Sequence, residues 1–294
     1  MPVIACEYLP KVRETVARLA KLAFDEDLPE GDATAEALHL AGEDAQARIF
    51  CREPIVMCGA AWFDLVRNEY LARYPERSLD IRCQLEDGAH VDSGSTLFNL
   101  EGDTAAIVGL ERTLLNFLGR AIGIATATHA YVRRVRQYGA TRIMDTRKTL
   151  PGYRYFDKYA VLCGGGANHR FSLSDQVLIK ENHLSRFHGP GQALEQVRRR
   201  LPHPLPLQIE VRDQETLYEA VEAGWPLIML DNFTPEMVKT ACDLPRRQSQ
   251  LEVSGGITLD NIENYCHPKL DRISIGALTH SVKAPDLSLL LEEG

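Results

Sequence analysis

Beyond residue 140 the chain repeats one pattern that strongly constrains its fold. A short apolar run ends on a polar or glycine residue, and sequence with helical periodicity follows it. The runs are RIMD ending at Asp145, VLIK at Lys180, LQIE at Glu210, LIML before Asp231, LEVS before Gly255, and RISI before Gly276. Helical patterns lie between these runs at 191–201, 214–223 and 235–241. Strands that alternate with helices predict a parallel sheet with right-handed crossovers.

Functional residue types at so many strand ends favour a β/α barrel, because barrel active sites gather at the carboxyl ends of the strands. Only six strand-like runs can be identified in this part of the chain. A full eight-stranded barrel usually needs about 250 residues. A doubly wound open sheet is the alternative arrangement.

The residues before this pattern predict a small α+β domain. Helical spacing covers 11–24, residues 48–51 read as a strand, and 54–74 read as mostly helical. Short alternating runs from 79 to 100 are broken by Asp-Gly and Ser-Gly, which predicts paired strands. The run DGAHVDSGSTLF also resembles lipoyl- and biotin-carrier domains. Such domains need a modifiable lysine, and none lies between Lys21 and Lys148, so this alternative fails.

Two helical runs are expected next, one beginning at 102–104 and a second at 125–138. Arg112 lies on the first, away from its apolar stripe, where a solvated arginine is the common case. That stripe consists of Ile107, Leu110, Leu114, Phe117 and Leu118.

Composition narrows the class of protein. A length of 294 residues suggests about two domains, and the net charge of −8 argues against a general nucleic-acid binder. The seven cysteines form no CxxC pair, and their odd number favours reduced thiols over a disulfide framework. No apolar run reaches the ~18 residues of a membrane span. We therefore expect a soluble, cytoplasmic protein without membrane contact.

Residues 145 to 183 form a cationic stretch inside this acidic chain. They include Arg147, Lys148, Arg154, Lys158, Arg170 and Lys180, with His169 and His183. Three glycines, 164–166, precede Asn168, and glycine lets backbone approach a ligand closely. A solvated charged loop is the alternative, but the strand-like run before Lys180 favours a pocket for a small anion.

Glu210 and Asp231 close successive strands and should share one rim of the barrel. Paired carboxylates there could serve acid–base chemistry, bind ribose hydroxyls or hold a hard metal ion. Asp231 could instead cap a helix starting at Thr234-Pro235. Small residues at two later strand ends predict a phosphate-binding site near His280. These residues are Ser254, Gly255, Gly256, Ser274, Gly276 and Ala277.

The segments DTRKT, GGGANHR and LIKENH, in this order, resemble quinolinate phosphoribosyltransferase (nicotinate-nucleotide pyrophosphorylase, carboxylating), a type II phosphoribosyltransferase family. The likeness extends over nearly the full length. It includes EGDATAEAL, REPIVMCGAA, DGAHVDSGSTLFNLEG, ERTLLNFLGRAIGIAT, IEVRD, IMLDNF, EVSGGI and SIGALTHS. Three positions depart from the expected family pattern: Ala121-Ile122 stands where Leu-Ser is expected, and Gln208 stands where an acid is common.

The resemblance implies an incomplete β/α barrel at 105–276 and an α+β open-sandwich domain at 1–104, on which the tail 277–294 packs. It implies transfer of phosphoribosyl from phosphoribosyl pyrophosphate to quinolinate with loss of CO₂, giving nicotinate mononucleotide and pyrophosphate for de novo NAD biosynthesis. The implied cofactor is Mg²⁺, held by Glu210 and Asp231, in part through water.

The resemblance also implies residue roles. Lys148, Glu210 and Asp231 would be catalytic, and Arg112 would reach the neighbouring subunit's site in a homodimer or a higher oligomer. The implied quinolinate site is Arg112, Arg147, His169, Arg170 and Lys180; guanidinium forks such as those of Arg147 and Arg170 suit carboxylates. The implied phosphoribosyl pyrophosphate site is Lys148, Glu210, Asp231, Ser254, Gly255, Gly256, Gly276, Ala277 and His280.

Three alternatives remain open at this point. One is a phosphoribosyltransferase of the same architecture acting on nicotinate or a related ring. Another is a Schiff-base barrel aldolase with Lys180 or Lys148 as nucleophile. The third is a non-catalytic phosphate-binding protein.

Overall fold

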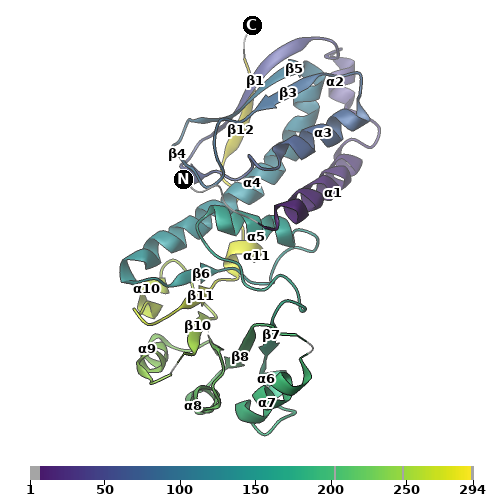
Figure 1. The fold of residues 1–294 in the computed structure, drawn as a ribbon. Coiled ribbons are helices and arrows are strands. Elements are labelled where there is room, and N and C mark those ends of the chain that lie inside the picture. The colour runs from purple at the N-terminus through teal and green to yellow at the C-terminus, as the bar shows by residue number, and fades with distance from the viewer. Residues whose placement is uncertain (1–6, 202, 247, 293–294) are drawn as a thin grey trace. The chain divides into compact units, whose positions relative to one another are not determined.

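The structure is a computed structural model that describes residues 7–201, 203–246 and 248–292 (Figure 1). Packing divides the chain into two compact units. The first contains the residues up to His129, Thr149–Gly165 and those from Ser281 onward, and the second contains Ala130–Lys148 and Gly166–His280. The boundary expected at 104/105 falls at the start of helix α4 (Thr104–Val135), whereas this division runs within that helix.

The first unit is built on a four-stranded antiparallel sheet in the order β12-β1-β5-β3. Its strands are β1 (Asp44–Cys51), β3 (Leu79–Arg82), β5 (Thr96–Asp103) and β12 (Leu287–Leu291). Burial largely alternates along β1 and β5, as expected for a sheet with one face on a core. The C-terminal segment thus returns to this unit, where β12 forms an edge strand beside β1.

The helices of this unit are α1 (Leu9–Asp27), α2 (Ala33–Ala37), α3 (Phe63–Arg73) and α5 (Arg154–Cys163), together with the part of α4 up to His129. The expectation of mostly helical structure over 54–74 is wrong at its start. Ile55–Val56 form strand β2, which pairs with β4 (His90–Val91). Both residues of β2 are buried, and the backbone N–H of Val56 donates to the Thr126 hydroxyl at 2.9 Å. Tertiary pairing thus overrides the helical spacing of this short run.

The two helical runs expected from 102 onward are also wrong, because α4 is one continuous helix of 32 residues. A short 3₁₀ helix, η1 (Arg136–Tyr138), follows it. Glycine within α4 serves a close contact. A Cβ added at Gly123 would lie 2.4 Å from the carbonyl oxygen of Lys283, so glycine lets the C-terminal segment pass close to the helix.

The second unit contains six parallel strands in the order β6-β11-β10-β9-β8-β7. They are β6 (Arg142–Met144), β7 (Val177–Ile179), β8 (Leu207–Val211), β9 (Leu227–Asp231), β10 (Gln250–Ser254) and β11 (Arg272–Ser274). Each coincides with one of the six runs found in the sequence. The helices between them are α6 (Glu181–Leu184), α7 (Pro190–Arg200), α8 (Gln214–Ala223), α9 (Pro235–Asp243) and α10 (Ile262–Tyr265), and α11 (Ala277–His280) follows β11.

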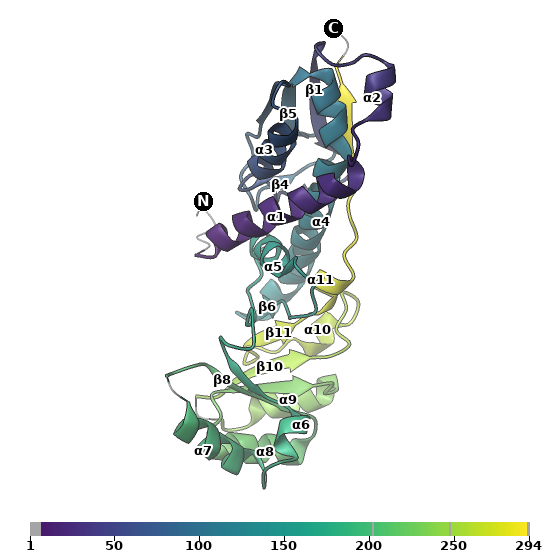
Figure 2. The ribbon, with the colours of Figure 1, turned by 90° about the vertical axis from the view of Figure 1, so that its right-hand side faces the viewer.

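This strand order confirms the incomplete barrel. From β7 to β11 each strand lies beside the next one in the chain, as in a barrel and unlike a doubly wound sheet, which reverses direction. β6 and β7 are consecutive in the chain but form the two edges, so the sheet is not closed (Figures 1 and 2). A single parallel bridge from Ala167 to Met144 extends the β6 edge. None of the helices in the described part of the chain combines the length and apolar character needed to cross a bilayer.

Candidate active site

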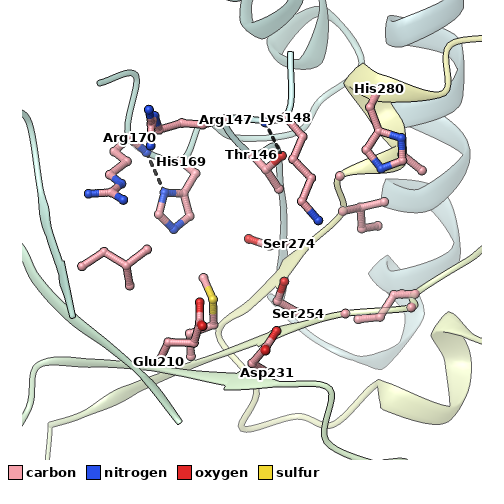
Figure 3. Close-up of a pocket in the computed structure, with 18 of the residues that line it drawn as sticks. Thr146, Arg147, Lys148, His169, Arg170, Glu210, Asp231, Ser254, Ser274 and His280 are labelled. Carbon is pink, nitrogen blue, oxygen red and sulfur yellow. Dashed lines mark hydrogen bonds between the residues drawn. The ribbon is translucent and has the colours of Figure 1, made fainter. Parts of the chain in front are cut away.

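A cavity of about 580 Å³ lies at the carboxyl ends of the parallel strands, within the second unit (Figure 3). All six strands contribute to its wall, either with residues at their carboxyl ends or with residues that directly follow them, so barrel topology gathers residues that are far apart in the sequence. Apart from Arg112, every residue predicted for the site lines this cavity. These are Arg147, Lys148, His169, Arg170, Lys180, Glu210, Asp231, Ser254, Gly255, Gly256, Gly276, Ala277 and His280.

Cationic side chains gather on one side of the cavity. Figure 3 shows Arg147, Arg170 and His169 close together, with Lys148 beside them. The Arg147 Nε is buried and has no hydrogen-bond partner within the described structure. Burial and the nearby charge of Arg147 lower the pKa of Arg170. Two guanidinium groups held near each other at a cavity wall form a favourable site for an anion with more than one negative charge.

Asp145 determines where these residues lie. It is the buried residue directly after β6, and its Oδ1 accepts a 2.8 Å hydrogen bond from the backbone N–H of His169. Its Oδ2 accepts a 2.6 Å bond from Asn168 Nδ2. The Asn168–Arg170 segment is therefore held beside the end of β6. The sequence pattern identifies Asp145 only as a strand end, although its place as the last residue of RIMD matches that of Glu210 in LQIE.

Carboxylates lie on the opposite side of the cavity in Figure 3, where Glu210 and Asp231 are neighbours. Lys180 Nζ is 2.8 Å from Glu210 Oε2, and Arg212 Nε is 3.3 Å from Asp231 Oδ2. Arg212 was not predicted for the site; it is exposed and also pairs with Glu181. Each rim carboxylate is thus matched by a cation.

Asp231 does not cap the helix that follows it. The N-cap of α9 is Thr234, whose hydroxyl accepts a 3.3 Å bond from the backbone N–H of Met237. Asp231 instead accepts a 3.1 Å bond from Asn232 Nδ2 and lines the cavity. The alternative of a purely structural capping carboxylate is therefore excluded.

Two glycine positions bring backbone into the cavity wall. Gly255 has φ +104°, and a Cβ added there would lie 2.2 Å from Asn232 Oδ1. A Cβ at Gly276 would lie 3.1 Å from both Lys148 Cδ and the His280 ring. The positive φ and the close contact require glycine at position 255, whereas a side chain at position 276 would crowd Lys148 and His280. The geometry fits the predicted phosphate-binding loops.

The structure divides the cationic stretch. Arg154 and Lys158 belong to α5 in the first unit, and neither lines the strand-end cavity. His183 accepts a 3.0 Å bond at Nδ1 from the backbone N–H of Lys180, so it caps α6. Arg112 is exposed on α4 in the first unit, where it lines a different cavity of about 400 Å³ with Asn116 and other residues.

The open barrel and its strand-end cavity define a β/α-barrel protein with a cationic pocket. Comparison with known proteins is more specific. The family model for the quinolinate phosphoribosyl transferase C-terminal domain matches residues 124–290, and the model for the N-terminal domain of the same family matches residues 32–122. The chain belongs to the quinolinate phosphoribosyltransferase family.

Relatives support this over almost the whole length. A nicotinate-nucleotide pyrophosphorylase [carboxylating] of Mycobacterium leprae is 38% identical over 97% of this chain and 98% of its own. The human protein of the same name is 33% identical over 96% of this chain and 93% of its own. The solved structure of nicotinate-nucleotide pyrophosphorylase from Francisella tularensis superposes with a TM-score of 0.87 at 36% identity, covering 95% of this chain and 97% of that one. A human nicotinic acid phosphoribosyltransferase shares the fold alone, with a TM-score of 0.59 and 11% identity.

Proposed function

We propose that this protein transfers the phosphoribosyl group of phosphoribosyl pyrophosphate to quinolinate and releases pyrophosphate and CO₂, forming nicotinate mononucleotide for NAD biosynthesis. The observation that carries the proposal is the pairing of Arg147 and Arg170 at one wall of a cavity whose opposite wall holds Glu210 and Asp231. Quinolinate has two adjacent carboxylates, which two guanidinium forks suit, and a ribose bears hydroxyls that carboxylates bind.

The chain's own residues would act mainly by binding and by charge. Arg147 and Arg170, with His169 and Lys180, would orient the dicarboxylate, and Lys148 would lie between the two substrates. Gly255, Gly256 and Gly276 would admit the 5-phosphate. The pyridine nitrogen then forms a bond to the anomeric carbon as the bond to pyrophosphate breaks, and Glu210 and Asp231 offset positive charge on the sugar.

Decarboxylation follows from the new positive charge on the ring nitrogen. The bond from the ring to the 2-carboxylate breaks, CO₂ leaves, and the electron pair remains on the ring carbon beside that nitrogen until solvent supplies a proton. The site must therefore hold the 3-carboxylate firmly while allowing the 2-carboxylate to leave. No general base of the protein is needed for this step.

We also propose that the reaction uses Mg²⁺ near Glu210 and Asp231. The described residues contain no cluster of three or more side chains that could hold a metal by themselves. Two neighbouring carboxylates fit the needs of Mg²⁺, which binds one or two carboxylates together with phosphate oxygens and waters. When bound, Mg²⁺ would supply charge neutralisation for the pyrophosphate. Lys180 and Arg212 pair with these carboxylates in the structure. With Mg²⁺ bound there, the two cations would be available to contact anionic groups of the substrates.

A homodimer with Arg112 in the partner's site is part of the proposal. Arg112 is exposed on α4 and forms no ion pair with an acidic group among the described residues, which leaves its guanidinium available to a second chain. We further propose that the protein works in the cytoplasm, since the six cysteines at described positions are free thiols.

The Schiff-base aldolase is less well supported. Lys180 Nζ lies 2.8 Å from a carboxylate, and a charged ammonium in an ion pair has no electron pair for attack on a carbonyl. A nicotinate-specific transferase would leave one of the two arginines without a carboxylate to bind. Neither alternative uses the whole set of cavity residues.

The decisive experiment incubates the protein with quinolinate, phosphoribosyl pyrophosphate and Mg²⁺. We expect nicotinate mononucleotide, pyrophosphate and CO₂ in equal amounts, and little turnover of nicotinate. Preference for nicotinate, or an adduct of Lys180 or Lys148 trapped by borohydride with a carbonyl substrate, would overturn the proposal. Arg170→Ala serves as the matched inactive control.

A further inference from the structure

A closed circuit of polar contacts runs through the barrel interior and includes Arg170. Its members are His169, Arg170, Gln176, Gln208 and Glu252, all in the second unit. Only His169 and Arg170 line the cavity. Gln176, Gln208 and Glu252 are buried and do not line it, so they act on a bound ligand through residues that do: His169 and Arg170 within the circuit, and Ser274, whose hydroxyl donates to Glu252.

The floor of the circuit consists of three side chains. Gln176 Nε2 donates a 2.7 Å hydrogen bond to Gln208 Oε1, and Gln208 Nε2 donates a 3.1 Å bond to Glu252 Oε2. Gln208 lies on β8 and Glu252 on β10, with β9 between them in the sheet. Side chains of alternate strands share one layer in a barrel interior, which explains why these two meet.

The rest of the circuit contacts Arg170 at two points, its backbone N–H and its guanidinium. His169 Nε2 lies 3.4 Å from Glu252 Oε1, a separation typical of a polar contact rather than a short hydrogen bond. His169 Nδ1 accepts a 2.8 Å bond from the backbone N–H of Arg170. The guanidinium Nη1 of Arg170 donates a 2.9 Å bond to the backbone carbonyl of Gln176, which closes the circuit.

The charge of Glu252 sets the orientation of the two glutamine amides in this circuit. Burial alone raises the pKa of Glu252, but the adjacent His169, the Ser274 hydroxyl and the Arg272 charge lower it more, so it lies below its ordinary value. An ionised carboxylate only accepts hydrogen bonds. Gln208 must therefore present its NH₂ group to Glu252 and its oxygen to Gln176.

We propose that Glu252 and Gln208 are positioning residues of this site, which hold the Arg170 guanidinium in the orientation that binds a carboxylate of the substrate. The inference rests on the proposed function for the identity of that substrate. Neither residue touches the ligand. Gln208 is required as an amide, because it must donate to one neighbour and accept from the other.

A double-mutant cycle tests whether Gln208 acts through Arg170. In Gln208→Leu and Glu252→Gln we expect quinolinate affinity to fall by about tenfold or more, the equivalent of one lost charge-assisted hydrogen bond. Affinity for phosphoribosyl pyrophosphate should change less than about twofold. In an Arg170→Ala background, Gln208→Leu should then have almost no further effect on quinolinate affinity.

Gln250→Leu is the matched control. Gln250 lies on β10 two residues before Glu252 and accepts a 2.9 Å bond from Arg272 Nη2, outside the circuit. It should leave both affinities unchanged. Equal losses for both substrates in Gln208→Leu, or an undiminished effect of Gln208→Leu when Arg170 is absent, would overturn the inference.

A measurement without substrate separates this inference from the proposed function. In arginine-labelled protein, the Nη–H signals of Arg170, assigned with Arg170→Lys, should be resolved because Gln176 holds that group. They should broaden in Gln208→Leu and Glu252→Gln but persist in Gln250→Leu. Unaltered signals in the first two variants would contradict the positioning role. A third outcome separates the two proposals. If the Arg170 signals are resolved and broaden in these variants, but the protein does not bind quinolinate, the positioning role stands and only the proposed substrate is wrong.

Discussion

Asp145 and His169 are joined by a 2.8 Å hydrogen bond in which the backbone N–H of His169 donates to the buried carboxylate at the end of β6. Twenty-four positions separate the two residues, yet this bond and its companion from Asn168 bring the second cationic segment to the first. The arrangement of the anion site therefore depends on a residue that does not line the cavity.

Asp145→Asn should weaken both the fold and the site. An amide offers one acceptor where the carboxylate offers two, so one donor loses its partner. We expect the free energy of unfolding to fall by about 1–3 kcal/mol, with a higher KM for quinolinate. Urea unfolding and steady-state kinetics measure the two effects. The exposed Asp260→Asn is the control, and a variant of Asp145 with wild-type stability and KM would refute this role.

Arg147→Ala should remove a guanidinium from the anion site without unfolding the protein. The loss in transition-state binding should be on the order of 2–5 kcal/mol, read from kcat/KM for quinolinate. Removal of its charge also relieves repulsion on Arg170, whose pKa is lowered by burial and by Arg147. Stability without substrate should accordingly be maintained.

Arg154→Ala is the matched control for that experiment. Arg154 belongs to the same cationic stretch but donates to the Thr149 hydroxyl and does not line the cavity. It should retain quinolinate kcat/KM. Should Arg147→Ala turn over quinolinate at the wild-type kcat/KM, its assignment to the dicarboxylate is wrong.

Glu252 should make stability depend on pH in a definite direction. His169, Arg272, the Ser274 hydroxyl and Gln208 face it, and its pKa lies below the ordinary value of 4.5. A folded-state pKa below the unfolded one contributes stability above the unfolded value, which is lost as pH falls through the folded value. The difference in unfolding free energy between wild type and Glu252→Gln should therefore be complete above about pH 5.5 and shrink as the pH falls below about 4.5. A difference that grows on acidification would contradict the assignment.

Strand positions were the most predictable part of this fold. Each of the six parallel strands is a short apolar run closed by a polar residue or glycine, and that local pattern survives because both faces of the sheet are covered. The β2 pairing and the unbroken α4 could not be found this way. Ile55 pairs with Val91, and the absence of a side chain at Gly123 allows the backbone of Lys283 to pass close by. Both features therefore depend on residues that are distant in the sequence.

The candidate site also has one part that the local sequence predicts and one part that it does not. Residues at strand ends were predictable because topology alone gathers them on one rim, which is how Glu210 and Asp231 came together with Lys180. The buried circuit was not predictable, because the polar partners of Gln208 and Glu252 are determined by side-chain packing across β9. Gln208 was noticed only as a departure from an expected acid, and its amide is what the circuit uses.

Glu210→Ala and Asp231→Ala should separate the two substrates. We expect each to weaken the use of phosphoribosyl pyrophosphate and Mg²⁺, because a carboxylate of the sugar and metal side is lost. Quinolinate affinity should survive, and loss of Glu210 would even leave Lys180 without its 2.8 Å partner. Calorimetry with each substrate alone measures the affinity for quinolinate and the affinity for phosphoribosyl pyrophosphate.

Glu181→Ala is a sharp control for Asp231→Ala. Glu181 pairs with the same Arg212 but does not line the cavity, so its loss should leave both substrates unaffected. The opposite pattern in Asp231→Ala, with lost quinolinate affinity and a normal dependence on Mg²⁺, would exclude it from the sugar side.

The last prediction concerns Arg112, the one predicted site residue outside the strand-end cavity. It lies on α4 in the first unit, exposed, beside a cavity that it shares with Asn116, Arg120 and Leu287. If it serves the partner's site in a two-fold dimer, Arg112→Ala and Arg170→Ala should each be almost inactive alone. In a mixed dimer, one site combines the intact barrel of the first chain with the intact Arg112 of the second.

The other site of that mixed dimer carries both defects. Random mixing makes half of the dimers mixed, so roughly a quarter of all sites should regain activity, because two-fold symmetry places each arginine in the other subunit's site. Co-expression of the two variants with different affinity tags, followed by purification on both tags, would raise the active fraction to about half of the sites. Confirmed mixed dimers without recovered activity would show that Arg112 does not act across the interface.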